Sequence, residues 1–168
     1  AITPFDGGGD DYPAAVSFDS NGDVLVGGYT HNGSNKDFFI AKYNGSTGAQ
    51  IWQESFNGVA NGDDFVTALA VDASGNFYVT GSSVNASGNS DIYTIKYASS
   101  DGSLLWEKSF NGVGNGYDIG DGIAFDPVDG SIMVGGSTFV GSGNHDYHLI
   151  RYGADGTFVW QKTLDRPI

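Results

Sequence analysis

The chain has 168 residues, 39% of them apolar, which is enough for one domain with a sizeable core. Its 20 acidic residues against 7 basic ones give a net charge of -13, which opposes binding to DNA, RNA or anionic lipid, because such binding needs clustered Lys and Arg. The lack of Cys excludes disulfides and thiolate metal sites.

The N-terminal segment 1–9 reads AITPFDGGG. It lacks a basic stretch followed by an apolar one, so we expect no signal peptide here, although a signal can have been removed from a precursor. No apolar run approaches the about 18–20 residues that span a bilayer, so no membrane insertion is expected. AITPF matches the end of the outermost strand in the units described below. We therefore expect 1–9 to be a leftover outer-strand segment, either a cover for another chain's sheet edge or a remnant of a preceding unit.

The rest of the chain consists of short apolar runs separated by turn-forming residues. In the middle of the chain the expected strands are 67–72, 77–82, 92–97 and 104–110. The separators are rich in Gly, Asn, Asp and Ser, which tolerate the positive φ of tight hairpin turns. No segment shows a helical period of 3.6 residues, and the 27 glycines and 14% aromatic residues agree with an all-β fold.

This pattern of strands occurs three times. Trp52, Trp106 and Trp160 lie 54 residues apart. The same period is followed closely by Lys42-Tyr43, Lys96-Tyr97 and Arg151-Tyr152, and by Asp19, Asp72 and Asp126. Four antiparallel strands in about 54 residues match one blade of a β-propeller. We predict three four-stranded antiparallel blades: blade 1 at about 10–57, blade 2 at about 63–111 and blade 3 at about 117–165.

The third strand of each unit separates a propeller from a sheet with one solvated face. In residues 38–43 (FFIAKY), alternate side chains place apolar groups on both faces. A blade packed between two neighbours needs this pattern, whereas a half-solvated sheet alternates more cleanly. A β-sandwich is the competing fold, but sandwiches rarely repeat in sequence at this period.

Residues 72–81, DASGNFYVTG, resemble the D-x-x-G-N-x-Y-V-x-G core of the SBBP family of bacterial and archaeal β-propeller repeats. Segments 19–28 and 126–136 are related to it. TGAQIW, DGSLLW and DGTFVW are similar to the TG-x-x-x-W segment of quinoprotein-type repeats. The resemblance covers nearly the whole chain and implies the propeller architecture. It implies no reaction and no cofactor, so we expect no enzyme.

Three blades do not close a ring, because propellers normally have about four to eight. If each open face left on the order of 500 Å² of apolar surface in water, about 12 kcal/mol of stabilisation would be forgone per face. Two chains can remove these faces by forming a six-bladed ring, or many chains by forming a filament; alternatively, the chain is part of a longer propeller. We therefore expect a homo-oligomer, with the dimer favoured over the filament.

Two sets of acidic residues are candidate sites. Asp19, Asn21 and Asp23 alternate like the first ligands of a calcium loop, and calcium is the one metal considered. The loop lacks the continuation of an EF-hand, so the favoured interpretation is that Asp19 bonds the backbone of its own turn. A second set recurs at the start of each first strand, which lines the central channel in propellers: Asp11, Asp64 and Asp118. They are candidate channel-mouth carboxylates for a cation or a basic partner, although anchoring of the turn between blades is favoured.

Other polar and aromatic residues have structural interpretations. His148 occupies the strand position of Phe39 and Tyr93 and is expected to pack. The regular Trp positions favour packing between blades over stacking on sugars. Asn32, Asn44 and Asn85 begin N-glycosylation patterns, whose occupancy the sequence does not decide.

We therefore expect a non-enzymatic structural or interaction module of an extracellular or cell-surface protein, bacterial or archaeal, that self-associates through its open blade faces. The alternative is a carbohydrate- or calcium-dependent ligand-binding propeller. A hydrolase using two of the many carboxylates is third, and no residue pair is assigned to it.

Overall fold

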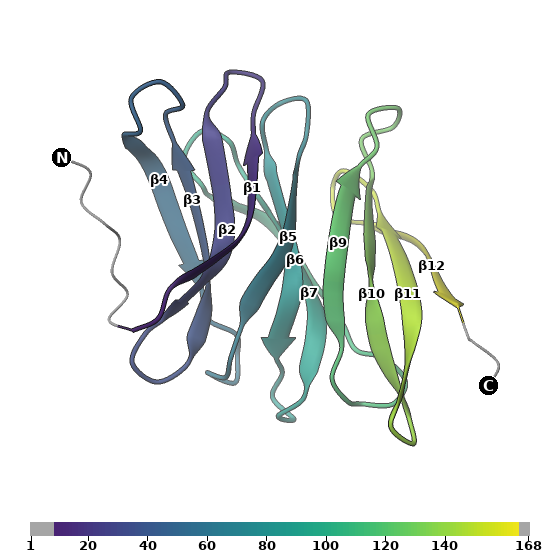
Figure 1. Cartoon of the computed structure of the whole chain (residues 1–168). Helices are drawn as coiled ribbons and strands as arrows, with labels where there is room; N and C mark the ends of the chain where they lie inside the picture. The colour runs from purple at the N-terminus through teal and green to yellow at the C-terminus, as the bar shows by residue number, and fades with distance from the viewer. Residues whose placement is uncertain (1–8, 165–168) are drawn as a thin grey trace.

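The computed structural model describes residues 9–164, which form antiparallel sheets (Figure 1). Blade 1 consists of β1 (Tyr12–Phe18), β2 (Val24–His31), β3 (Lys36–Tyr43) and β4 (Gln50–Phe56). Blade 2 consists of β5 (Phe65–Val71), β6 (Phe77–Val84), β7 (Ser90–Tyr97) and β8 (Leu104–Phe110). Blade 3 consists of β9 (Ile119–Phe125), β10 (Ile132–Gly141), β11 (Asn144–Tyr152) and β12 (Phe158–Leu164). Among these residues, no helix is long and apolar enough to cross a membrane.

The predicted four-stranded antiparallel blades are confirmed. Within each sheet the strands follow one another in sequence order. The strand β5 begins at Phe65, two residues before the expected start. The reason is Asp64, whose backbone N–H donates to the carbonyl O of Lys36 and whose carboxylate accepts the N–H of Val84, so that pairing of β5 with β6 begins at once. The leftover segment expected at 1–9 lies outside the described residues, apart from Gly9.

Blade 2 lies between blades 1 and 3 (Figure 1), and two hydrophobic clusters fill the two interfaces. The first cluster joins blades 1 and 2 through Leu25, Phe38, Ile40, Trp52, Val66, Phe77, Val79, Ile95 and Tyr97. The second joins blades 2 and 3 through Tyr78, Ile92, Ile132, Val134, Ile150 and Tyr152. Neither cluster of described residues joins blade 1 to blade 3.

The strand β6 shows why both faces of a blade are apolar. Successive side chains of a strand point to opposite faces. Accordingly, Phe77 and Val79 belong to the cluster with blade 1, whereas Tyr78 belongs to the cluster with blade 3. All three side chains are fully buried. The packing of both faces, predicted from the third strand, is thus confirmed for blade 2.

Candidate functional site

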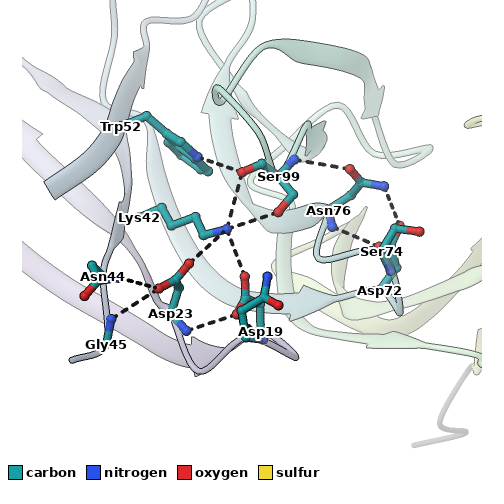
Figure 2. Close-up of polar contacts among 11 residues, drawn as sticks. Asp19, Asp23, Lys42, Asn44, Gly45, Trp52, Asp72, Ser74, Asn76 and Ser99 are labelled. Carbon is teal, nitrogen blue, oxygen red and sulfur yellow. Dashed lines mark hydrogen bonds and ion pairs between the residues drawn. The ribbon is translucent and has the colours of Figure 1, made fainter.

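A polar contact joins blade 1 to blade 2 at the end of the first hydrophobic cluster. The ammonium of Lys42 on β3 and the indole N–H of Trp52 on β4 both donate to the carbonyl O of Ser99, at 3.4 and 3.1 Å (Figure 2). Ser99 lies in the turn between β7 and β8. The Lys42 ammonium also donates to the Ser99 hydroxyl, at 3.1 Å. One turn of blade 2 therefore receives two donors from blade 1.

The same contact recurs between blades 2 and 3. Lys96 and Trp106 both donate to the carbonyl O of Ala154, each at 3.2 Å. Strand register makes the two contacts equivalent, because each lysine lies opposite its tryptophan and each acceptor lies two residues after the last tyrosine of its third strand. We call this arrangement the interblade clasp: a cation and an indole N–H of one blade converging on a turn carbonyl of the next.

A glycine completes each clasp. A Cβ atom on Gly102 would lie 2.8 Å from the Trp52 ring, and one on Gly156 would lie 2.8 Å from the Trp106 ring. Both glycines have positive φ, at 75° and 80°. The turn before the fourth strand therefore needs glycine for two reasons: the backbone has positive φ, and the indole of the preceding blade approaches closely.

The lysine of the first clasp is also held by carboxylates of its own blade. The Lys42 ammonium lies 2.8 Å from Asp19 and 3.6 Å from Asp23 (Figure 2). The side chain of Lys42 is 6% exposed and that of Asp19 is not exposed. Burial tends to raise the pKa of Asp19, but the hydrogen bonds from Lys42 and from the turn N–H groups outweigh burial and hold that pKa below its ordinary value. A buried ion pair thus anchors the cation that reaches the next blade.

These contacts describe what the candidate calcium residues do. Asp19 accepts the backbone N–H groups of Asn21 and Asp23 at 2.8 and 3.0 Å, the turn-capping arrangement. The structure brings Asp19 and Asp23 together around the Lys42 ammonium, while Asn21 contributes its backbone. Within residues 9–164 no group of three or more His, Asp or Glu side chains is placed to hold a metal ion. Calcium binding stays a prediction. In this structure the ammonium of Lys42 lies between the carboxylates of Asp19 and Asp23.

The candidate channel-mouth carboxylates anchor turns. Asp64 is fully buried and accepts the N–H groups of Gly58 and Val84, at 2.5 and 3.0 Å. Asp118 is fully buried too and accepts those of Gly112 and Phe139, at 2.5 and 2.7 Å. Burial raises the pKa of Asp64 against the lowering effect of these hydrogen bonds.

Asp11 has a looser contact with the N–H of His31, at 3.4 Å. The carboxylates of Asp64 and Asp118 are buried and anchor the crossover between blades. Binding of a cation or a basic partner by Asp11, Asp64 and Asp118 stays a prediction.

We expect Asp64→Asn to destabilise the chain by about 2 kcal/mol. An amide has only one acceptor oxygen, so the backbone N–H of either Gly58 or Val84 would face the amide NH₂ group and lose its acceptor. Urea unfolding at a concentration where the chain is monomeric measures this. The matched control is Asp63→Asn, whose exposed side chain lies 3.8 Å from Lys36 and should change stability by less than about 0.5 kcal/mol. Equal effects of the two substitutions would contradict the anchoring role.

The remaining polar and aromatic candidates make structural contacts within or between the blades. His148 is 3% exposed and stacks on Phe110 with ring centroids 4.4 Å apart, which confirms the packing interpretation. Packing between blades, predicted for the Trp positions, is confirmed for Trp52, which packs against Phe77, and for Trp106, which packs against the second cluster. Trp160 on the outer side of blade 3 is 38% exposed. The three glycosylation-pattern asparagines each donate from their side-chain amide to a carboxylate: Asn32 to Asp37, Asn44 to Asp23 and Asn85 to Asp91.

Side chains on the outer side of blade 3 are more exposed than the side chains at the same positions of blades 1 and 2. We call it the blade-3 face, made of Met133, Tyr147, Leu149, Trp160 and Leu164. All of these except Trp160 line a hollow of about 540 Å³. Tyr147 is 67% exposed, whereas Phe38 and Ile92 at the same register position are 0% and 1% exposed. The blade-3 face therefore has the side chains of a packing surface, and none of the blades described in residues 9–164 packs on it.

The opposite side of blade 1 is open in the same way. We call it the blade-1 face, made of Val16, Phe18, Val24 and Val26. Val16 is 65% exposed and Phe18 is 67% exposed. Their counterparts in blade 2, Leu69 and Val71, pack against the first hydrophobic cluster. The chain thus ends on two different faces, each of which has packed counterparts within the chain.

The interblade clasp was not predicted as a site. The sequence marked Lys42, Lys96 and Arg151 only as members of a repeating basic-aromatic pair. The sequence did contain a signal for the clasp: a basic residue recurs at the same position of each third strand, and the other side chains of that strand are largely apolar on both faces. The acceptors carry no signal, because a backbone carbonyl imposes no residue type on Ser99 or Ala154.

Comparison with known proteins bears on the fold. A family model described as a domain of unknown function (DUF5122) beta-propeller matches residues 129–158, in blade 3. No curated protein matches the chain. Among solved structures the chain is similar to the crystal structure of BamB from Moraxella catarrhalis, with 15% sequence identity and a TM-score of 0.50. The similarity covers 90% of this chain but 38% of that one. Together with the three four-stranded sheets, these matches show that the chain folds as β-propeller blades.

Proposed function

We propose that the chain is a non-enzymatic interaction module that associates with further copies of itself, the blade-3 face of one copy packing on the blade-1 face of the next. One observation carries this proposal. The faces that meet inside the chain, blade 1 on blade 2 and blade 2 on blade 3, are the register counterparts of the two faces that stand open at its ends.

The glycines of the second strands support the same pairing. A Cβ on Gly27 would lie 3.1 Å from Val66 and 3.7 Å from both Leu69 and Val79, all in blade 2. A Cβ on Gly135, the counterpart in blade 3, would meet only Leu149 of its own sheet. The counterpart in blade 2 is Thr80, and there the glycine lies on the facing strand, because a Cβ on Gly120 of blade 3 would collide with Thr80. Blade 3 therefore repeats the arrangement of blade 1, in which glycine leaves room for the next blade's apolar side chains, although no fourth blade follows among the described residues.

Two chains that pair through both sets of faces make a six-bladed ring, within the range of about four to eight blades that propellers use. Sedimentation velocity over a wide concentration range tests this association. We expect a mass near twice 17.6 kDa. Much larger species would support a filament formed by the same contacts. A mass of one chain at every concentration up to the millimolar range would contradict the proposal.

We further propose that the blades are SBBP-type repeats of an extracellular or cell-surface protein. The segment 72–81, the net charge of -13 and the lack of Cys support this assignment. Fractionation of the source cells, with surface protease digestion, tests it. Recovery of the native protein only inside the cells would contradict the location.

A further inference from the structure

We propose that the interblade clasp forms a third time, between chains: Arg151 and Trp160 of one copy converge on the backbone carbonyl O of Gly45 in a second copy, whose Gly48 lies under the Trp160 ring. This inference rests on the proposed self-association and names the polar contact that sets its register. The two clasps inside the chain supply the geometry.

The two proposed donors, Arg151 and Trp160, lie on blade 3. Arg151 lies opposite Trp160 between β11 and β12, as Lys42 lies opposite Trp52 and Lys96 opposite Trp106. Trp160 is 38% exposed, against 7% for Trp52. Within residues 9–164 no group accepts a hydrogen bond from the Trp160 indole N–H, whereas the other two indoles donate to the next blade.

The cation is oriented by carboxylates of its own blade, as in the first clasp. Arg151 lies 3.0 Å from Asp126 and 2.8 Å from Asp129, and its Nε donates to the Ser131 hydroxyl at 3.0 Å. Asp126 is the counterpart of Asp19, which holds Lys42. Arginine has five N–H donors, so contacts with its own carboxylates leave donors for a further acceptor.

The acceptor stands on blade 1. Gly45 lies two residues after Tyr43, as Ser99 follows Tyr97 and Ala154 follows Tyr152. Among the described residues, nothing donates to the Gly45 carbonyl O, while the Gly45 N–H donates to Asp23. Gly48 has a φ of 69° and precedes β4, as Gly102 precedes β8 and Gly156 precedes β12. Blade 1 therefore keeps an acceptor turn although no described blade precedes it.

The test compares association constants by sedimentation velocity. We expect Trp160→Phe, which keeps a ring and removes the indole N–H, to weaken association about fivefold. We expect Gly48→Ala to weaken it at least about tenfold, because its Cβ collides with the second copy's indole. Gly88→Ala is the matched control: Gly88 also has positive φ, 83°, and an added Cβ meets nothing within 4 Å. It should leave association unchanged.

A second measurement reads the hydrogen bond itself. In a ¹⁵N-labelled wild-type chain, the Trp160 indole N–H signal, assigned by its loss in Trp160→Phe, should become protected from exchange with water as concentration rises. Association that is insensitive to Trp160→Phe and Gly48→Ala, with Trp160 still exchanging, would overturn the clasp and leave self-association standing. A wild-type chain that stays monomeric at every concentration would overturn the proposed function and the clasp together.

Discussion

A Val16→Asp chain and a Tyr147→Asp chain are each expected to remain monomeric when kept apart and to form a two-chain complex when mixed. Val16 is 65% exposed and Tyr147 is 67% exposed, so neither substitution disturbs the core of its own chain. In the association both positions are covered by the second chain, as their counterparts are within one chain: Leu69 is partly buried against the first cluster and Phe38 is fully buried. An unpaired carboxylate there costs about 3 kcal/mol or more, which weakens association at least about a hundredfold.

The mixture restores one interface because the two faces differ. The Val16→Asp chain keeps an intact blade-3 face, and the Tyr147→Asp chain keeps an intact blade-1 face. These two faces pack on each other, while both remaining faces carry a carboxylate. Growth therefore stops at two chains, which sedimentation velocity or light scattering detects as a mass near twice 17.6 kDa.

A control and two outcomes make this test decisive. Val113→Asp places a carboxylate on the crossover loop, where Val113 is already 90% exposed, and should associate like the wild type. If the Val16→Asp chain alone formed dimers, blade-3 faces would be pairing with each other. If the mixture stayed monomeric while the wild type associated, the interface would lie elsewhere on the chain.

Replacing Lys42 by Met is expected to lower the free energy of unfolding by about 3 kcal/mol or more. The substitution keeps most of the apolar stem and removes the ammonium. Asp19, whose side chain is fully buried, then loses its ion pair, and the Ser99 carbonyl O loses one of its two donors. Urea unfolding at low chain concentration measures the loss.

Lys36→Met is the matched control on the same strand. Its ion pair with Asp63 spans 3.8 Å, and the two side chains are 36% and 53% exposed, so we expect a loss below about 1 kcal/mol. The double variant Asp19→Asn with Lys42→Met should recover part of the loss, because no unpaired charge remains buried. A similar loss in Lys36→Met and Lys42→Met would contradict the role assigned to burial.

The pH dependence of stability checks the same ion pair independently. Burial raises the pKa of Asp19, but hydrogen bonds led by that from Lys42 outweigh it, and the folded-state pKa lies below the ordinary 3.8. Such a carboxyl contributes stability that is present above pH 3.8 and is lost as the pH falls through the folded-state value. In Lys42→Met this contribution is reduced, so the stability gap between wild type and variant should narrow as the pH is lowered below 3.8.

The blade architecture could be predicted because it follows from local chemistry. Turn-forming residues at regular spacing select hairpins, and alternation of side chains decides which positions are apolar. Both signals lie within a few residues of each strand, as in 77–82, where the predicted and observed strands begin together at Phe77. The start of β5 was missed because it depends on Asp64 bonding to Lys36 and Val84, which are far from it in sequence.

The candidate site could be predicted only in part. Repetition identified Asp64 and Asp118 as equivalent, but their complete burial depends on loops and strands that fold around them. Repetition likewise identified Lys42 and Lys96 without indicating their acceptors. A contact with a backbone carbonyl leaves no mark on the sequence of the turn that supplies it.

The sequence by itself determined the number of blades, the strands in each and the apolar character of both blade faces, because these depend on residue type at fixed spacing. Only the tertiary structure decided which of the equivalent residues are buried. Trp52 and Trp160 are the same residue at the same position of a blade, yet they are 7% and 38% exposed. The physical reason is that a side chain is buried only where two blades meet, and among residues 9–164 no blade packs on the outer face of blade 3.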